Sequence, residues 1–376
     1  MMRFHSPKYL LILTLVLAAV VVFLVGSAPT YSADHNLVHS ELDSQQTSCR
    51  YGSAAPPDDV WVDELGIGWT IDFGASPRPF LPDVEYVPII RIKQSRSMDD
   101  TRIADYYLTS PPSEERLVEL LERFPGRIWQ VGNEVDRIWW QDDIMPDVYA
   151  TAYHELYHLI KKHDPTALVA PSALVQVTPG RLQYLDIVWD TYQEKYGAEM
   201  PVDVWNMHIY ILPERSLTNP GSGSRAGIAL GTDPDLAIYD SGNSPDPALC
   251  PRDDVYCYAE HDSIEIFKEQ AIAMRRWMKE RGEQDKPLIL TEFSILYPYK
   301  EETDPDYDPE TCPDCFSLQD EYGEVFSRTR VLEYMNQTLN FLETATDPEL
   351  GYPEDNYRLV QQWNWFSVYS VTPGSP

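Results

Sequence analysis

Apolar and polar positions follow two alternating patterns along the chain beyond residue 64. Short apolar runs, typical of buried strands, alternate with longer stretches in which apolar residues recur every three or four positions, as they do on one face of a helix. The predicted strands span residues 65–71, 86–92, 127–133, 167–172, 202–210, 287–293 and 359–368. The predicted helices span residues 113–124, 147–163, 180–196, 262–282 and 329–345.

This alternation predicts parallel strands joined by helical crossovers, the arrangement of α/β proteins. Seven strands are recognisable and a closed barrel needs eight, so we expect the missing strand between Ile92 and Arg127 or before Leu65. The connections at 211–262 and 294–324 are far longer than usual, and both follow a strand. We therefore expect a (β/α)8 TIM barrel with long loops on its C-terminal face, where barrel active sites lie.

The N-terminal region has the pattern of an export signal. Arg3 and Lys8 precede an apolar run over residues 10–25, and small residues follow it. The length of the run leaves open whether the segment is cleaved or retained as an anchor, and either outcome places the domain outside the cell, secreted or membrane-anchored. The predicted organisation is a signal peptide or membrane anchor at 1–28, a disordered linker at 29–57 and a barrel domain at 58–376. No eighth helix is recognisable after the last predicted strand, so a barrel truncated at its C-terminus is an alternative to a complete one.

Composition and charge narrow the range of partners. The 376 residues are 43% hydrophobic, enough for one large core, and the formal net charge is −31. Such a charge excludes nucleic acids and anionic lipid surfaces as partners, so membrane contact is expected only through the N-terminal segment. Of the five cysteines, Cys250 with Cys257 and Cys312 with Cys315 are close enough in sequence to predict loop disulfides, with a redox pair or half a zinc site as alternatives for the second pair. Cys49 has no predicted partner.

Two glutamates stand at the ends of predicted strands. Glu134 ends the segment WQVGNE and Glu292 ends PLILTE, each directly after an apolar run. Burying a carboxylate is costly without partners, whereas a catalytic cleft gives a reason to keep it there. Exit of the strand into solvent is the alternative explanation for either residue alone.

Several motifs in order resemble the retaining glycoside hydrolases of clan A. They are Asn133-Glu134, His208-x-Tyr210, Thr291-Glu292-Phe293 and Trp365. The chain is most similar to compact catalytic cores related to endo-β-1,3-glucanases, over roughly residues 65–368. The Asn-Glu-Pro of that family is Asn133-Glu134-Val135 here.

The resemblance implies a role for each of these residues. Glu134 is expected to be the acid/base and Glu292 the nucleophile, with environments that keep Glu134 protonated and Glu292 ionised. Asn133 would bind the sugar 2-hydroxyl, while His208 and Tyr210 would orient Glu292. His208 is alternatively a buried core histidine. The candidate aromatic surfaces for sugar rings are Trp365, the pair Trp139 and Trp140, which alternatively anchor a loop, and, as a weaker candidate, Trp69.

The expected function is a retaining glycosidase that cleaves β-linked oligo- or polysaccharides without a metal or cofactor. A barrel that binds carbohydrate without turnover is the alternative. A remote alternative is a zinc protease, because His154-Glu155-x-x-His158 has the letters of a zinc-binding helix. Helical periodicity places this pair opposite the apolar stripe of its helix, so both histidines are expected to face solvent, and Lys161 and Asp164 occupy positions where a third-ligand motif needs Gly and His.

Overall fold

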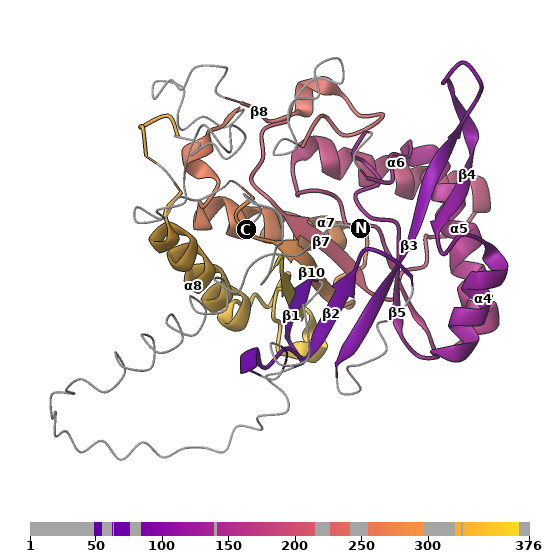
Figure 1. Cartoon of the computed structure of the whole chain (residues 1–376), viewed down its shortest axis with the longest axis horizontal. Helices are drawn as coiled ribbons and strands as arrows, with labels where there is room; N and C mark the ends of the chain where they lie inside the picture. The colour runs from indigo at the N-terminus through magenta and orange to yellow at the C-terminus, as the bar shows by residue number, and fades with distance from the viewer. Residues whose placement is uncertain are drawn as a thin grey trace, which may run out of the picture. The chain divides into compact units, whose positions relative to one another are not determined.

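A computed structural model of the chain contains a barrel of eight parallel strands. It describes residues 49–54, 62, 64–75, 84–138, 141–214, 226–240, 255–296, 320–324 and 326–367. The strands lie in the order β6-β5-β3-β2-β1-β11-β10-β7, and each adjacent pair is parallel. Figure 1 labels β1, β2, β3, β5, β7 and β10 of this barrel. Their bounds are β1 (Tyr51–Ala54), β2 (Trp69–Asp72), β3 (Glu85–Arg96), β5 (Ile128–Val131), β6 (Leu168–Pro171), β7 (Trp205–Ile209), β10 (Leu288–Phe293) and β11 (Gln362–Trp365).

Hydrogen bonds close the seam between the first and last strands of this order. The backbone N–H of Asp203, just before β7, donates to the carbonyl of Val169 at 3.1 Å. Further along, the N–H of His208 donates to the carbonyl of Leu174 at 3.3 Å. The expected (β/α)8 fold is therefore confirmed.

The strand missing from the sequence pattern is β1, which lies before Leu65 and within the segment expected to be a disordered linker. That expectation is wrong for Tyr51–Ala54, which pairs with both β2 and β11. The strand has only four residues and includes Gly52 and Ser53, so it lacks an apolar run. Gly52 is required by packing, since a Cβ there would lie 2.6 Å from the indole of Trp69. The barrel thus begins before residue 58.

A further strand, β4 (Arg102–Ser110), lies in the other region where the missing strand was sought. It pairs antiparallel with β3 and is not part of the barrel wall. The hairpin of β3 and β4 rises past the C-terminal ends of the neighbouring strands (Figure 1).

Five long helices connect the strands, and each predicted helix is confirmed with its ends within two residues. Serine side chains cap three of them, where Ser113, Ser263 and Ser327 accept a hydrogen bond from a backbone N–H of the first turn. The helices are α4 (Glu114–Arg123), α5 (Pro146–His163), α6 (Pro179–Tyr196), α7 (Ile264–Glu280) and α8 (Arg328–Thr344).

The two long connections follow the C-terminal ends of β7 and β10, as expected. The described part of the connection after β7 contains two short helices and two short strands. One more short helix lies between α8 and β11. These are the 3-10 helices η1 (Pro234–Leu236), η3 (Tyr258–Glu260) and η4 (Pro353–Asp355), and the paired strands β8 (Tyr239–Asp240) and β9 (Val255–Tyr256).

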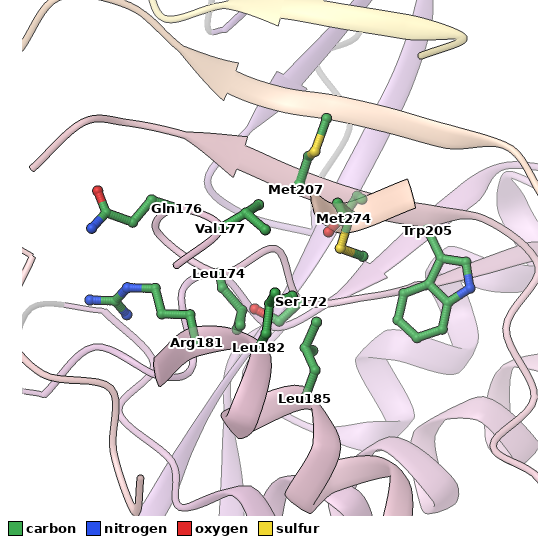
Figure 2. Close-up of a pocket in the computed structure, with 11 residues that line it drawn as sticks. Ser172, Leu174, Gln176, Val177, Arg181, Leu182, Leu185, Trp205, Met207 and Met274 are labelled. Carbon is green, nitrogen blue, oxygen red and sulfur yellow. The ribbon is translucent and has the colours of Figure 1, made fainter. Parts of the chain in front are cut away.

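Packing divides the apolar side chains into a large cluster between strands and helices and smaller clusters inside the barrel. One interior cluster fills the N-terminal end of the barrel and consists of Trp69, Val87, Ile128, Ala170, Val204 and Ile289. A cavity of about 10 Å³ lies beside β7 and α6 (Figure 2). Its volume is at the lower limit for a single water, so it cannot hold a sugar.

Several expectations concern residues outside the described ranges. The N-terminal segment at 1–28 is one of them. Within the part of the chain that the structure describes, no helix has the length and hydrophobicity needed to cross a bilayer. Cys250, Cys312 and Cys315 also lie outside, while Cys257 is described and buried. The two disulfide pairings stay predictions.

Candidate active site

Glu134 is placed by a tight turn directly after β5. Gly132 has φ 87°, and a Cβ there would lie 2.6 Å from the side chain of Val135, so only glycine fits. Glu134 itself has φ 45°, a conformation that is uncommon for residues other than glycine. Its backbone N–H donates to the carbonyl of Ala173 at 3.0 Å. The turn therefore fixes Glu134 between β5 and the segment after β6.

A buried carboxylate holds this turn from the other side. Asp142 accepts hydrogen bonds from the backbone N–H of Asn133 at 2.9 Å and from Arg91 Nε at 2.6 Å. Burial raises the pKa of Asp142 to about 6, against the opposing effect of the Arg91 guanidinium. Asn133 is fully buried, and its amide nitrogen donates to Gln141 Oε1 at 3.4 Å. The position of Glu134 thus depends on β3 as well as on β5.

Glu292 reaches the barrel interior through an irregularity in β10. Leu290 pairs with Met207 of β7, but the next residue in register with His208 is Glu292 rather than Thr291. Such a bulge sets two residues of one strand against one of its partner and redirects a side chain. Glu292 consequently lies beside His208.

His208 bridges the two glutamates. Its Nδ1 lies 3.1 Å from Glu134 Oε1, and its Nε2 lies 3.5 Å from Glu292 Oε1. Tyr210 donates its hydroxyl hydrogen to Glu292 Oε2 at 2.9 Å, and Arg137 Nη1 lies 3.3 Å from Glu134 Oε2. The structure therefore brings together Glu134, His208, Tyr210 and Glu292, all four of which the sequence had singled out.

The electrostatics of the pair differ from the expected order. Burial alone would raise the pKa of Glu134, but the hydrogen bond from His208 and the charge of Arg137 outweigh it and hold this pKa well below its ordinary range. Burial raises the pKa of Glu292 to about 7; His208 and the hydroxyl of Tyr210 oppose the shift, and the charge of Glu134 adds to it. The directions of these two shifts are opposite to the expectation from the resemblance, in which Glu134 holds the proton and Glu292 is ionised.

Among the described residues, Glu134, His208 and Glu292 form the one group with the composition of a metal site. An oxygen of Glu134, a ring nitrogen of His208 and an oxygen of Glu292 all lie within 4.8 Å of one another. However, the cationic Arg137 already lies against Glu134, and a divalent ion placed beside it would be repelled. Acid–base chemistry between two carboxyls suits this site better than metal binding.

The predicted aromatic surfaces have mixed outcomes. Trp69 begins β2 and belongs to the cluster at the N-terminal end of the barrel, remote from the carboxyls, so its candidate role is wrong. Trp365 is buried edge-on against Phe293, with ring centroids 5.2 Å apart, and belongs to the cluster between strands and helices, so its ring faces away from the carboxyls and does not fit the expected sugar platform. Trp139 and Trp140 lie outside the described residues.

Sequence reasoning missed two half-buried aromatic residues inside the barrel mouth. Phe73 follows β2 and Phe366 follows β11, and their rings meet edge to face at 5.8 Å over Ala54, Ile71 and Ile89. Neither residue belongs to a recognisable motif. Side chains alternate along β11, so Phe366 faces inward because Trp365 packs in the outer cluster, but the sequence alone does not show which face of this strand is interior.

A buried charge cluster also escaped the sequence analysis. Arg181, at the start of α6, is fully buried between the carboxylates of Asp136 and Glu214, with Nε 3.0 Å from Glu214 Oε1. Gln176 donates to the same oxygen at 3.1 Å, and the polar ends of Gln176 and Arg181 point to the same side of the cavity in Figure 2. The cluster joins the turn after β5 to the loop after β7.

The zinc-helix pattern lies on α5, outside the barrel. The expectation that both histidines face solvent holds for His158, which is exposed, but not for His154. The ring of His154 stacks on Tyr196 of α6 at 3.5 Å, and its Nδ1 lies 2.8 Å from the hydroxyl of Tyr192. Glu155 accepts a hydrogen bond from Tyr106. These contacts give the motif a packing role between helices, which the stripe on α5 alone did not reveal.

No protein-family model matches the chain, and no curated protein sequence matches it. Its fold is similar to that of a GH128 endo-β-1,3-glucanase from Pseudomonas viridiflava, at 14% identity over 87% of this chain and 90% of that one, with a TM-score of 0.47. A curdlan-specific GH128 exo-β-1,3-glucanase from Blastomyces gilchristii gives 12% identity, coverage of 86% and 91%, and a TM-score of 0.46. A β-xylosidase from Caulobacter crescentus gives 15%, coverage of 84% and 57%, and a TM-score of 0.45. At these identities the similarities concern the fold alone, and no residue assignment depends on them.

Proposed function

We propose that the chain is a retaining glycosidase that cleaves β-linked glycans outside the cell. The observation that carries the proposal is the proximity of the two buried glutamates, which have oxygens within 4.8 Å of one another. Retaining glycosidases hold their carboxyl groups about 5–5.5 Å apart, whereas inverting enzymes leave about 6.5–9.5 Å for a water. The export-like N-terminal segment supports the location.

Each carboxyl has one task in the proposed double displacement. Glu292 attacks the anomeric carbon while Glu134 protonates the departing oxygen, and water then releases the sugar from Glu292 with Glu134 acting as base. Tyr210 orients Glu292 by its hydrogen bond. Asn133 binds the 2-hydroxyl in this proposal.

His208 supports a route by which the resting charge order becomes the catalytic one. The pair of glutamates starts with its proton on Glu292. His208 accepts that proton at Nε2 and gives its Nδ1 proton to Glu134, which leaves Glu292 ionised and Glu134 protonated. The distance of 3.1 Å from Nδ1 to Glu134 is within hydrogen-bond reach, whereas the distance of 3.5 Å from Nε2 to Glu292 has to shorten when substrate binds before this relay can operate.

The test is a screen followed by trapping. The purified chain is incubated with β-glucans, xylans and mannans, and the anomer first released from the best substrate is followed by NMR. Retention of configuration is expected. A 2-deoxy-2-fluoro glycoside of the matching sugar should then label the peptide that contains Glu292, because the fluorine slows release of the covalent intermediate. Inverted product, or a label on Glu134, would contradict the proposal.

A barrel that binds carbohydrate without turnover is the second candidate. The resting charge order favours it, since an ionised Glu134 cannot donate a proton. Saturable binding of a glycan whose bonds stay intact through prolonged incubation would support this alternative.

A further inference from the structure

A groove of about 410 Å³ lies on the hairpin of β3 and β4, beyond the barrel mouth. Figure 1 shows this hairpin projecting at the end of the barrel where the catalytic candidates lie. The groove is lined by Lys93, Gln94, Arg96, Asp100, Tyr107 and Asp143. No part of it belongs to the site described above.

The groove continues the wall of the barrel mouth. Lys93 and Tyr107 are directly paired across the two strands, so their side chains share one face of the hairpin. Arg91 precedes Lys93 by two residues and shares that face, because side chains alternate along a strand. Arg91 binds Asp142, which in turn binds the residue before Glu134. The hairpin face is therefore tied to the carboxyl pair.

One side of the groove is a fixed ion cluster. Asp143, which is 8% exposed, lies against Arg96 at 3.2 Å and also against Arg102. Arg102 further donates to Gln94 Oε1 at 3.1 Å. These charges satisfy one another and hold one side of the groove in place.

The other side carries Lys93 and Tyr107, whose side chains have no ionic or aromatic partner among the described residues. Lys93 forms no ion pair with any described residue, and the ring of Tyr107 is 50% exposed without an aromatic partner among them. A flat ring beside an ammonium group suits a sugar, whose C–H face packs on aromatic surfaces and whose hydroxyls accept hydrogen bonds.

We propose that this groove is a distal glycan subsite in which Tyr107 packs against a sugar ring and Lys93 donates to its hydroxyls. The inference rests on the proposed function and adds to it: the substrate is an oligo- or polysaccharide that extends from the carboxyl pair along the hairpin, rather than a disaccharide. Asp143 and its two arginines hold one side of this subsite.

The test compares substrates of increasing length. In Tyr107→Ala, KM for long oligosaccharides of the best polysaccharide should rise about tenfold, the equivalent of about 1.4 kcal/mol for an aromatic contact. Hydrolysis of an aryl monoglycoside, which does not reach the groove, should change less than about twofold. Tyr107→Phe keeps the ring and should restore KM for long substrates, and Lys93→Ala should raise it in the same length-dependent way.

A matched control removes an exposed tyrosine at the opposite end of the barrel. Tyr357 is 42% exposed and has φ 60°, which asparagine tolerates, so Tyr357→Asn should leave every KM unchanged. An equal rise of KM for aryl and long substrates in Tyr107→Ala, or no rise at any length, would overturn the subsite. If the wild type hydrolyses nothing, affinity electrophoresis in the same polysaccharides decides: weaker retention of Tyr107→Ala than of Tyr357→Asn supports the subsite, and equal retention overturns it.

Discussion

The two ends of the barrel are built from the same strands but hold different side chains in the interior. At the N-terminal end lie Val87, Val204 and Ile289. Arg91 lies four residues after Val87, and His208 lies four residues after Val204, at the C-terminal end. A spacing of four keeps a side chain on the same face of a strand, so each strand changes from apolar to charged within its own length.

On β10 the same change requires a departure from regular alternation. Ile289 and Glu292 are three residues apart, and both face the interior only because of the bulge between Leu290 and Glu292. Bulges are common near active sites because they re-aim a side chain. The site therefore depends on a local irregularity that the N-terminal end does not have.

The two ends of the barrel also differ in where their charged side chains lie. A hollow of about 330 Å³ at the N-terminal end is lined by Ile128, Val204 and Ile289, and its rim charges, Arg50 and Asp355, pair at 2.7 Å. At the C-terminal end Glu134 and Glu292 are 3% and 5% exposed, and one of them has a strongly raised pKa. Burying charge in this way is unfavourable for folding, so we attribute it to function.

The largest expected effect is at Glu292. Glu292→Ala removes the nucleophile and should lower kcat by at least about 10⁴-fold, as loss of a nucleophile does in other enzymes. Added azide should restore turnover with an inverted glycosyl azide as product. The control is Glu283→Gln, since Glu283 is also buried but lies before β10 and binds the indole of Trp205 at 3.0 Å. Comparable losses in both variants would break the contrast between the two ends.

The pH dependence is the next largest effect. Between the depressed pKa of Glu134 and the pKa of about 7 at Glu292 the pair carries one proton, and above about pH 7 it carries none. Because the general acid needs that proton, kcat/KM should fall about tenfold per pH unit above pH 7. A profile that stays flat to pH 9 would show that the carboxyl pair does not supply the acid.

The raised pKa of Glu292 also fixes the sign of a stability change. In the folded protein the pKa of Glu292 lies above the ordinary value of 4.5, so the folded state binds a proton here more tightly than the unfolded chain does. The resulting contribution to the free energy of unfolding is complete below about pH 4.5 and is lost as the pH rises to about 7. In Glu292→Gln this loss is absent. Urea unfolding at pH 5 and pH 8 should therefore show a smaller decrease in the free energy of unfolding for the variant than for the wild type.

The sequence predicted those elements of the fold whose apolar pattern repeats over many residues. The five helices repeat an apolar stripe over many residues, and their positions were predictable within two residues. Glu134 and Glu292 were found because each ends an apolar run, and His208 was found only through the resemblance to clan A glycoside hydrolases. β1 was missed because four residues with Gly52 carry no pattern, and the position of Phe366 depends on which face of β11 is interior. Arg181 becomes central only when Asp136 and Glu214, distant in sequence, are folded against it.

A conservative change at the apolar end sharpens the comparison. Ile289→Val removes one methylene from the interior cluster and should lower the free energy of unfolding by about 0.5–1.5 kcal/mol. kcat/KM should stay within about twofold, because this layer lies at the opposite end of the strands from the carboxyl pair. Urea unfolding and initial rates measure the two quantities, and a large loss of activity at unchanged stability would contradict the separation of the two ends.

The smallest expected effect concerns the histidines of α5, which test whether chemistry is confined to the C-terminal end. His154→Gln loses the contact with Tyr192 and the stacking on Tyr196, and should cost about 1 kcal/mol of stability. The exposed His158 is the matched control, and His158→Gln should stay within about 0.5 kcal/mol. Glycan hydrolysis should persist in both variants and in EDTA, because neither side chain contacts the carboxyl pair. One zinc per chain, lost with all activity on replacing either histidine, would move the active site to this helix and restore the protease interpretation.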